Sequence, residues 1–211
     1  MKNYFLINKK LKKLYKIIEE KYLNSPKITY FTHSLRVANY CYQIGTIEKV
    51  DLDIIVAAAL IHDIGKTICS GFREHVLYTK EEGPKILLEC NYYEEEIKKI
   101  MQIAISHHPK KDEVLNDIYE QILFDADNLD CVGSFGIIRW YNGISPKLEN
   151  TISDAKMYIE YFSFENRKRF FYTDYAHKRA DHLVKEGIEY ANKLIKFCEL
   201  SIEQNENLFP F

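Results

Sequence analysis

The stretch from Ala57 to Lys66, AAALIHDIGK, constrains the fold more than any other part of the sequence. An apolar run leads into the adjacent pair His62 and Asp63, and a glycine two residues later breaks the pattern. Neighbouring side chains on a regular helix point about 100° apart, so they rarely reach one target from mid-helix. At the end of a buried helix that is followed by a glycine, both can converge. An imidazole and a carboxylate delivered together from an apolar wall indicate a metal site.

Helical periodicity dominates the rest of the chain, and strand-like alternation is scarce. The pattern predicts an all-α helical bundle, in which Asp51 caps the helix that ends at His62 and Thr173 caps the last helix. A looser stretch is expected at residues 133–146, where glycines and a proline cluster. We expect one domain over residues 1–211, with a core at about 28–150 and a C-terminal helical extension at about 151–205. The expected helices are 9–23, 30–47, 51–62, 74–91 with Pro84 as a kink or a new start, 93–107, 115–132, 153–164 and 173–200.

Composition excludes several classes of protein. With 46% hydrophobic and 28% charged residues, the chain resembles an ordinary globular protein. A net charge of −2 gives no basic field for a large nucleic acid, and no apolar run reaches the about 20 residues of a membrane span. The five cysteines are scattered and odd in number. They therefore predict free thiols in a reducing compartment, and we expect a cytoplasmic protein.

The metal-binding side chains fall on separate expected helices. His33 lies on the inner stripe of the second helix, His62 and Asp63 end the third, and Asp127 lies on the apolar face of LFDADNL. Taken singly, a buried histidine is more often a hydrogen-bonded core residue, and Asp127 could be a cap or an ion-pair partner. Taken together, several ionisable groups on apolar faces are costly to bury unless they are paired or bind a metal. We therefore favour a shared metal site in the bundle core.

The ordered set, with the phrases THSLRV, HDIGK and FDADNLDCVGSFGIIRWYNG, resembles the HD superfamily of metal-dependent phosphohydrolases over about Tyr30 to Ala191. The last phrase resembles the bacterial branch that includes nucleotide pyrophosphohydrolases. The resemblance implies a divalent cation (Mn, Mg, Co, Ni or Fe) that activates water against a small phosphorylated substrate, expected to be a nucleotide. It assigns the metal-ligand positions to His33, His62, Asp63 and Asp127.

The same resemblance suggests residues that contact substrate. Lys66 matches a lysine for which a phosphate contact is the usual proposal, and a solvated loop lysine is the alternative. Arg36, one turn after His33, and Arg139 are further candidates for a substrate phosphate. Some relatives carry two acidic residues directly after HD, and this chain does not. Either Glu74 is the general base, or the reaction needs none.

Some HD relatives bind two metals, among them HD-GYP cyclic-dinucleotide phosphodiesterases and diadenosine-polyphosphate hydrolases. His75 and the pair His107–His108 fall in a comparable order, but the GYP signature is missing and the spacing from Asp63 to His75 is short. We favour one metal, with His75 and His107 on the substrate side or supporting the ligands.

Three functions remain open from the sequence. A phosphohydrolase is expected first, with pyrophosphate release from nucleotides ahead of 5′-nucleotidase or phosphodiesterase activity. The missing acidic pair leaves open a metal-containing nucleotide sensor that does not hydrolyse. The third is a structural helical protein whose buried histidines only form hydrogen bonds with one another. A homodimer is compatible with each of them.

Overall fold

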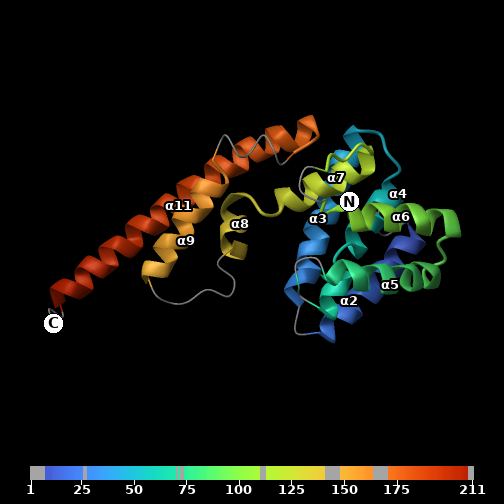
Figure 1. Cartoon of the computed structure of the whole chain (residues 1–211), viewed down its shortest axis with the longest axis horizontal. Helices are drawn as coiled ribbons and strands as arrows, with labels where there is room; N and C mark the ends of the chain where they lie inside the picture. Colours follow the sequence, from blue (N-terminus) through green and yellow to red (C-terminus); the bar gives the residue numbers. More distant parts are fainter. Residues whose placement is uncertain are drawn as a thin grey trace. The chain divides into compact units, whose positions relative to one another are not determined.

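The structure is a computed structural model that describes residues 8–25, 28–69, 71, 74–109, 113–140, 148–163 and 171–208. Every regular element in these residues is helical, which confirms the all-α prediction (Figure 1). The chain divides into two compact units, Met1–Asp127 and Asn128–Phe211. The expectation of a single domain with a core at 28–150 stays a prediction. None of the helices in the described residues combines the length and apolar character that a membrane span requires.

The first unit contains the predicted helices in the predicted order. The first helix has the expected bounds, and most of the others differ from expectation by a few residues at each end. Pro84 lies inside one continuous helix, so no second piece starts there. The elements are α2 (Lys9–Leu23), α3 (Ile28–Ile47), α4 (Leu52–Ile61), the 3₁₀ helix η1 (Ile64–Thr67), α5 (Glu74–Glu89), α6 (Glu94–Ser106) and α7 (Ile118–Leu129).

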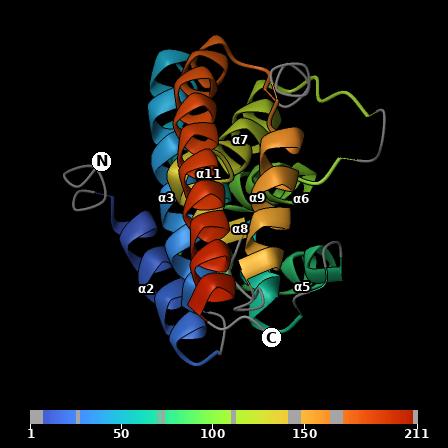
Figure 2. The same ribbon diagram turned by 90° about the vertical axis from the view of Figure 1, so that its left-hand side faces the viewer.

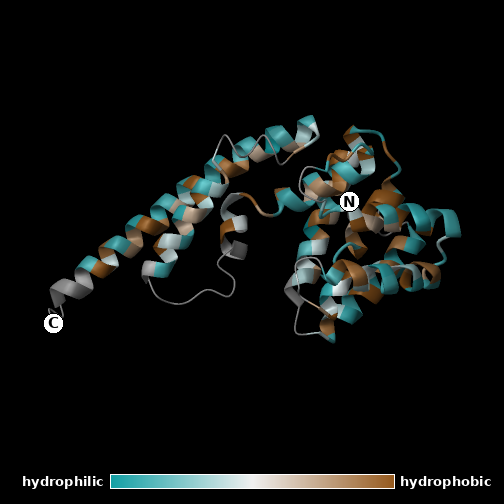
Figure 3. Cartoon of the chain, in the orientation of Figure 1, coloured by the Kyte–Doolittle hydropathy of each residue, from teal (hydrophilic) through white to brown (hydrophobic). Residues whose placement is uncertain are grey.

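Helix α4 forms the centre of the first unit. All residues from Ile54 to Ile61 are buried, and the helix is apolar on every side (Figure 3). A helix of this kind must be surrounded by other elements, and α2, α3 and α6 pack against it. The carboxylate of Asp51 accepts hydrogen bonds from the backbone N–H groups of Asp53 and Ile54, which confirms the predicted N-cap. The buried helix thus carries His62 and Asp63 into the interior.

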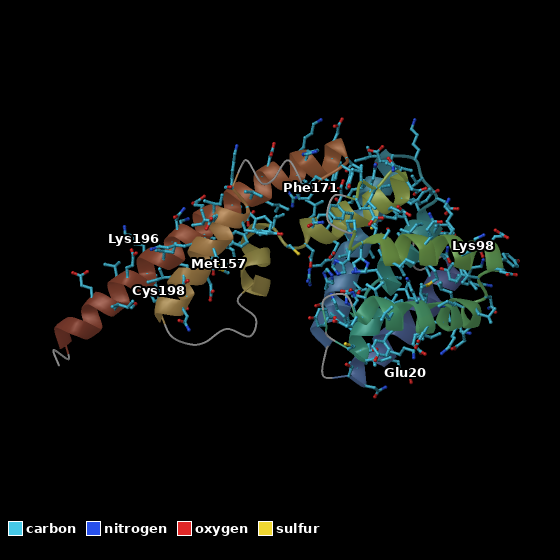
Figure 4. The ribbon with its side chains drawn as sticks, viewed as in Figure 1. Glu20, Lys98, Met157, Phe171, Lys196 and Cys198 are labelled. Carbon is cyan, nitrogen blue, oxygen red and sulfur yellow. The ribbon has the colours of Figure 1, made fainter. Side chains whose placement is uncertain are left out.

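The helices that the described residues of the second unit form are α8 (Gly133–Trp140), α9 (Leu148–Tyr161) and α11 (Asp174–Leu208). Helices α9 and α11 lie side by side, as Figures 1 and 2 show. Cys198 of α11 is buried, whereas Met157 of α9 is 51% exposed (Figure 4). The hydroxyl of Thr173 accepts a hydrogen bond from the backbone N–H of Ala176, which confirms the predicted cap. The last helix extends past the expected end at about Leu200.

The expectation of a loose stretch at residues 133–146 is wrong for its first half, because α8 occupies residues 133–140. Gly133 has a φ of +82°, a conformation that favours glycine, and the helix begins there. A Cβ on Gly136 would overlap the backbone oxygen of Cys131. Both glycines therefore serve local geometry and close packing inside structure. Residues 141–147 lie outside the described residues.

Candidate metal centre

The end of α4 delivers two adjacent side chains to one place. His62 keeps helical dihedral angles (φ −53°, ψ −37°), whereas Asp63 leaves the helix at φ −105° and ψ 11°. The second pair of angles lies in the bridge region, where many active-site residues are found. This change of direction brings Nε2 of His62 within 3.5 Å of Oδ2 of Asp63. The convergence predicted from the sequence therefore occurs.

The predicted metal ligands lie together. The ligand atoms of His33, His62 and Asp63 all lie within 4.8 Å of one another, and the three residues are buried. Nε2 of His33 lies 3.5 Å from Oδ2 of Asp63 and 3.1 Å from Oδ1 of Asp127. Asp127, with 18% of its side chain exposed, therefore borders the group from α7. Helices α3, α4 and α7 each supply part of this first cluster.

A second cluster faces the other oxygen of Asp63. His75 of α5 and the pair His107–His108 at the end of α6 also place ligand atoms within 4.8 Å of one another. Nε2 of His75 lies 3.1 Å, and Nε2 of His107 lies 3.6 Å, from Oδ1 of Asp63. The carboxylate of Asp63 is thus shared between two groups of imidazoles. His108 was not among the predicted site residues, although the histidine doublet was visible in the sequence.

Backbone hydrogen bonds orient three of these rings. Nδ1 of His62, His75 and His107 lies 2.7, 2.9 and 2.6 Å from the backbone oxygens of Ala59, Gly71 and Ala104, respectively. A carbonyl oxygen can only accept, so each Nδ1 carries the proton and donates it. In the neutral ring, Nε2 then presents a lone pair towards Asp63. Such an outer hydrogen bond is typical of metal-binding histidines.

The cluster fits a divalent cation. Nε2 of His62 and Oδ1 of Asp63 are buried and make no hydrogen bond within the described residues. A buried polar atom without a partner costs about 1–3 kcal/mol, and lone pairs that face a carboxylate repel it unless a cation lies between them. Imidazole and carboxylate donors together suit Mn, Fe, Co or Ni. The chemistry of the donor set and the two orphaned atoms therefore agree.

Burial and charge set the ionisation states in the first cluster. Burial lowers the pKa of His62 from 6.5 to about 4, so the ring is neutral at neutral pH. Burial alone would raise the pKa of Asp63, but the neighbouring histidines and Lys66 outweigh it and hold that pKa well below its usual value. The pKa of Asp127 is also lowered, because His33 outweighs the effect of burial. Two ionised carboxylates, Asp63 buried and Asp127 partly exposed, attract a cation at neutral pH.

The remaining predicted site residues occupy different settings. Nζ of Lys66 lies 2.6 Å from Oδ2 of Asp63 and 4.7 Å from the centre of the Tyr30 ring. Its side chain is only 14% exposed, so the alternative of a solvated loop lysine is wrong. Arg36 is half-buried one turn after His33, and Glu74 is exposed at the first position of α5. The side chain of Arg139 lies outside the described residues.

The depressed pKa of His62 predicts a loss of stability in acid. The imidazole of His62 takes up a proton near pH 6.5 in the unfolded chain and only near pH 4 in the folded chain. The contribution of His62 to the free energy of unfolding is therefore complete above pH 6.5 and is lost as the pH falls towards 4. At pH 5 the free energy of unfolding should have fallen by about 2 kcal/mol from this group. Urea unfolding with a chelator present, at pH 7 and pH 5, measures the loss.

The variant His62→Gln should show a smaller pH dependence, because it carries no titrating imidazole. The exposed His182→Gln is the matched control and should keep the slope of the parent protein. An unchanged slope in His62→Gln would contradict the assignment of this loss to His62.

Comparison with known proteins agrees with the fold. Residues 30–131, just under half of the chain, match the family model of the HD domain. This confirms the predicted resemblance and supports a hydrolase in general. An uncharacterised protein of Clostridium beijerinckii is 33% identical over 100 residues. That match spans 46% of this chain and 61% of the relative, which is under two thirds of the relative's length.

Solved structures share the fold. A predicted HD superfamily hydrolase from an uncultured Thermotogales bacterium has a TM-score of 0.64 and 21% identity, over 88% of this chain and 91% of that chain. YpgQ of Bacillus subtilis has a TM-score of 0.63 and 23% identity, over 90% of this chain and 97% of that chain. The structure of YpgQ in complex with ADP has a TM-score of 0.57 and 24% identity, over 78% and 87% of the two chains.

Proposed function

We propose that the protein is a metal-dependent phosphohydrolase that cleaves a phosphoester or phosphoanhydride bond of a nucleotide-like substrate. The observation that carries this proposal is the meeting of His33, His62 and Asp63 within 4.8 Å, with Asp127 beside His33. The HD domain supports a hydrolase, and the ADP bound to YpgQ supports a nucleotide among the candidate substrates. Pyrophosphate release is the first candidate, and 5′-nucleotidase or phosphodiesterase activity is the second.

The residues divide into those that hold a cation and those that meet the substrate. His33, His62, Asp63 and Asp127 would hold the cation. A divalent cation supplies Lewis-acid chemistry, because it polarises a phosphoryl oxygen and lowers the pKa of a water molecule. The substrate-facing residues of this proposal are Lys66, Arg36, Arg139, His75 and His107, with Glu74 as the candidate general base.

Lys66 is the best placed of the substrate-facing residues. Its ammonium group already lies against Oδ2 of Asp63, so a phosphate at the metal ligands would lie within reach of a fixed positive charge. Arg36 adds a guanidinium, whose planar fork matches phosphate oxygens. Glu74 is exposed, so it could take up a proton only from the solvent-facing side of the site.

The second histidine cluster raises the number of cations that the protein could bind. His75 and His107 present imidazole nitrogens to Oδ1 of Asp63, as the first cluster does to Oδ2, and His108 places a ligand atom within 4.8 Å of theirs. We therefore extend the proposal to a second cation that shares Asp63. The sequence alone favoured one metal, because it could not show that imidazoles also lie beside Oδ1 of Asp63.

Elemental analysis of cobalt-loaded protein tests this extension. We expect two ions per chain in the parent protein and one in His107→Gln, because the variant loses a central donor of the second cluster only. The exposed His182→Gln should bind the same number of ions as the parent. One ion per chain in both the parent and His107→Gln would contradict the proposal of a second cation. His75 and His107 would then be substrate-side or supporting residues.

A substrate panel tests the proposed reaction. Full-length protein loaded with Mn²⁺, Co²⁺ or Ni²⁺ is incubated with nucleoside triphosphates, nucleoside monophosphates and a bis-aryl phosphodiester. Phosphate and pyrophosphate are measured separately. Pyrophosphate from triphosphates would support the first candidate, and turnover of the other substrates would support the second. No turnover in metal-loaded protein would contradict hydrolysis.

A nucleotide sensor is the alternative that the missing acidic pair favours. Tight nucleotide binding in a calorimeter, without release of phosphate or pyrophosphate, would select it. A purely structural protein would bind neither metal nor nucleotide, and its melting temperature would not rise with added metal. A homodimer and a cytoplasmic location stay predictions from the sequence.

A further inference from the structure

The backbone carbonyl groups at the end of α4 need partners from elsewhere. The last carbonyl groups of any helix have no partner inside that helix. In α4 these groups belong to the turn that carries His62 and Asp63, and the turn is buried. The carbonyl of Ala59 accepts from the ring of His62. The carbonyl groups of His62 and Asp63 themselves accept from side chains on two other helices.

Tyr22 supplies one of these partners from α2. Its side chain is fully buried, and its hydroxyl donates to the backbone oxygen of Asp63 at 2.8 Å. The same oxygen accepts from the backbone N–H of Lys66, also at 2.8 Å. A tyrosine hydroxyl carries its proton at neutral pH, so Tyr22 is the donor in this hydrogen bond. Helix α2 lies before residues 30–131, the segment that matches the HD domain.

Thr79 supplies the other partner from α5. Its hydroxyl donates to the backbone oxygen of His62 at 3.2 Å and accepts from the backbone N–H of Gly65 at 3.1 Å. One buried hydroxyl thus bridges the His62–Asp63 peptide and the Ile64–Gly65 peptide. The same helix carries His75, whose ring faces Oδ1 of Asp63. Thr79 therefore links the turn to the helix that carries part of the second histidine cluster.

These contacts act at Asp63, where the backbone departs from regular helical geometry. Asp63 adopts φ −105° and ψ 11°, so the direction of its carboxylate depends on the two peptide groups that flank it. Tyr22 holds the peptide after Asp63, and Thr79 holds the peptide before it. A rotation of either peptide would turn the carboxylate away from the imidazoles. Both hydrogen bonds end on backbone oxygens of Asp63 and His62, so their effect passes through these two residues.

We propose that Tyr22 and Thr79 are positioning residues that orient His62 and Asp63 for cation binding, and that α2 is therefore part of the catalytic unit. This inference rests on the proposed function, because it assumes that His62 and Asp63 hold a cation. Outer partners of metal ligands typically change metal affinity by about 10- to 100-fold. Neither residue was a candidate from the sequence, since a tyrosine and a threonine on helix stripes look like ordinary core residues.

Cobalt binding by four variants of the full chain tests the inference. Tyr22→Phe removes the hydrogen bond to Asp63 and keeps the ring, and Thr79→Val removes the hydrogen bonds to His62 and Gly65 and keeps the shape. Thr79→Ser keeps the hydroxyl. Tyr158→Phe is the matched control, because Tyr158 is also fully buried and its hydroxyl donates to a backbone oxygen, that of Gly133, at 3.2 Å. The readouts are the cobalt dissociation constant, the visible spectrum of the bound cobalt and the melting temperature.

We expect Tyr22→Phe and Thr79→Val to weaken cobalt binding by about 10- to 100-fold and to alter the cobalt spectrum. Thr79→Ser should restore both properties. Tyr158→Phe should lower the melting temperature by a similar amount and leave both cobalt properties unchanged. A role in stability alone would lower the melting temperature in all the Phe and Val variants without a selective change in the spectrum.

Two results would overturn the inference while the proposed function survives. One is parent-like cobalt binding and spectrum in both Tyr22→Phe and Thr79→Val. The other is an equal loss of affinity in Tyr158→Phe. If the parent protein itself binds no cobalt, the proposed function fails, and the inference that depends on it fails as well.

Discussion

Replacing Asp63 by alanine is expected to abolish cation binding and to lower phosphohydrolase activity by at least about 1,000-fold. The carboxylate lies against both histidine clusters, with Oδ2 towards His33 and His62 and Oδ1 towards His75 and His107. A bound cation stabilises the transition state by several kcal/mol, and about 4 kcal/mol corresponds to 1,000-fold in rate. Its loss should therefore be the largest single effect on activity.

The measurement is elemental analysis together with initial rates on the best substrate of the panel. Asp53→Ala is the control, because it removes a carboxylate from the first turn, at the opposite end of the same helix, where an acidic side chain interacts favourably with the helix dipole. Asp53→Ala should bind the cation and turn over substrate as the parent does. If Asp63→Ala retained stoichiometric metal and activity, the metal centre would have to lie elsewhere.

Replacing Gly65 by alanine is expected to cause the largest loss of stability among small substitutions. An added Cβ would overlap the backbone oxygen of His75 and lie 2.8 Å from the backbone nitrogen of Thr79. These are main-chain atoms of α5, so no side-chain rotation relieves the overlap. Overpacking costs about 1–3 kcal/mol and occasionally more, and here we expect the upper end, which lowers the melting temperature by about 6–12 °C. Displacement of α5 should also weaken cation binding, since α5 carries His75.

Gly45→Ala is the matched control for this prediction. An added Cβ there would lie 3.1 Å from methyl groups of Leu52 and Val50, which are side chains that can move. The substitution also favours α3, because alanine is a better helix former than glycine by about 1 kcal/mol. We therefore expect a change within about 1 kcal/mol. Thermal unfolding of both variants measures the difference in melting temperature between them. Equal melting temperatures would show that α5 does not pack tightly against η1 at Gly65.

Local patterns were sufficient for most of the helices. The stripe of α2 has the expected bounds, and the caps at Asp51 and Thr173 are present, because capping and periodicity depend on residues a few positions apart. Helix α8 was missed because its glycines were interpreted as helix breakers. The role of Gly136 depends on the backbone oxygen of Cys131, and a glycine that permits close packing looks the same in sequence as one that breaks a helix.

The sequence predicted which side chains form the candidate site better than it predicted how they are arranged. The order of His33, His62, Asp63 and Asp127 indicated one cluster, and the structure brings these side chains together. The metal-ligand assignment itself stays a prediction. Lys66 could be a phosphate contact or a solvated residue on sequence grounds, and its position against Asp63 depends on how η1 turns.

The sequence by itself determined that this chain is helical, that α4 is buried on every side, and that an imidazole and a carboxylate leave its end together. Only the tertiary structure decided that Asp63 faces histidines on both of its oxygens and that Tyr22 and Thr79 hold its backbone. The physical reason is distance along the chain. Helix formation and capping arise from neighbouring residues, whereas the direction of a buried carboxylate is set by helices that are remote in sequence and meet only when the core has packed.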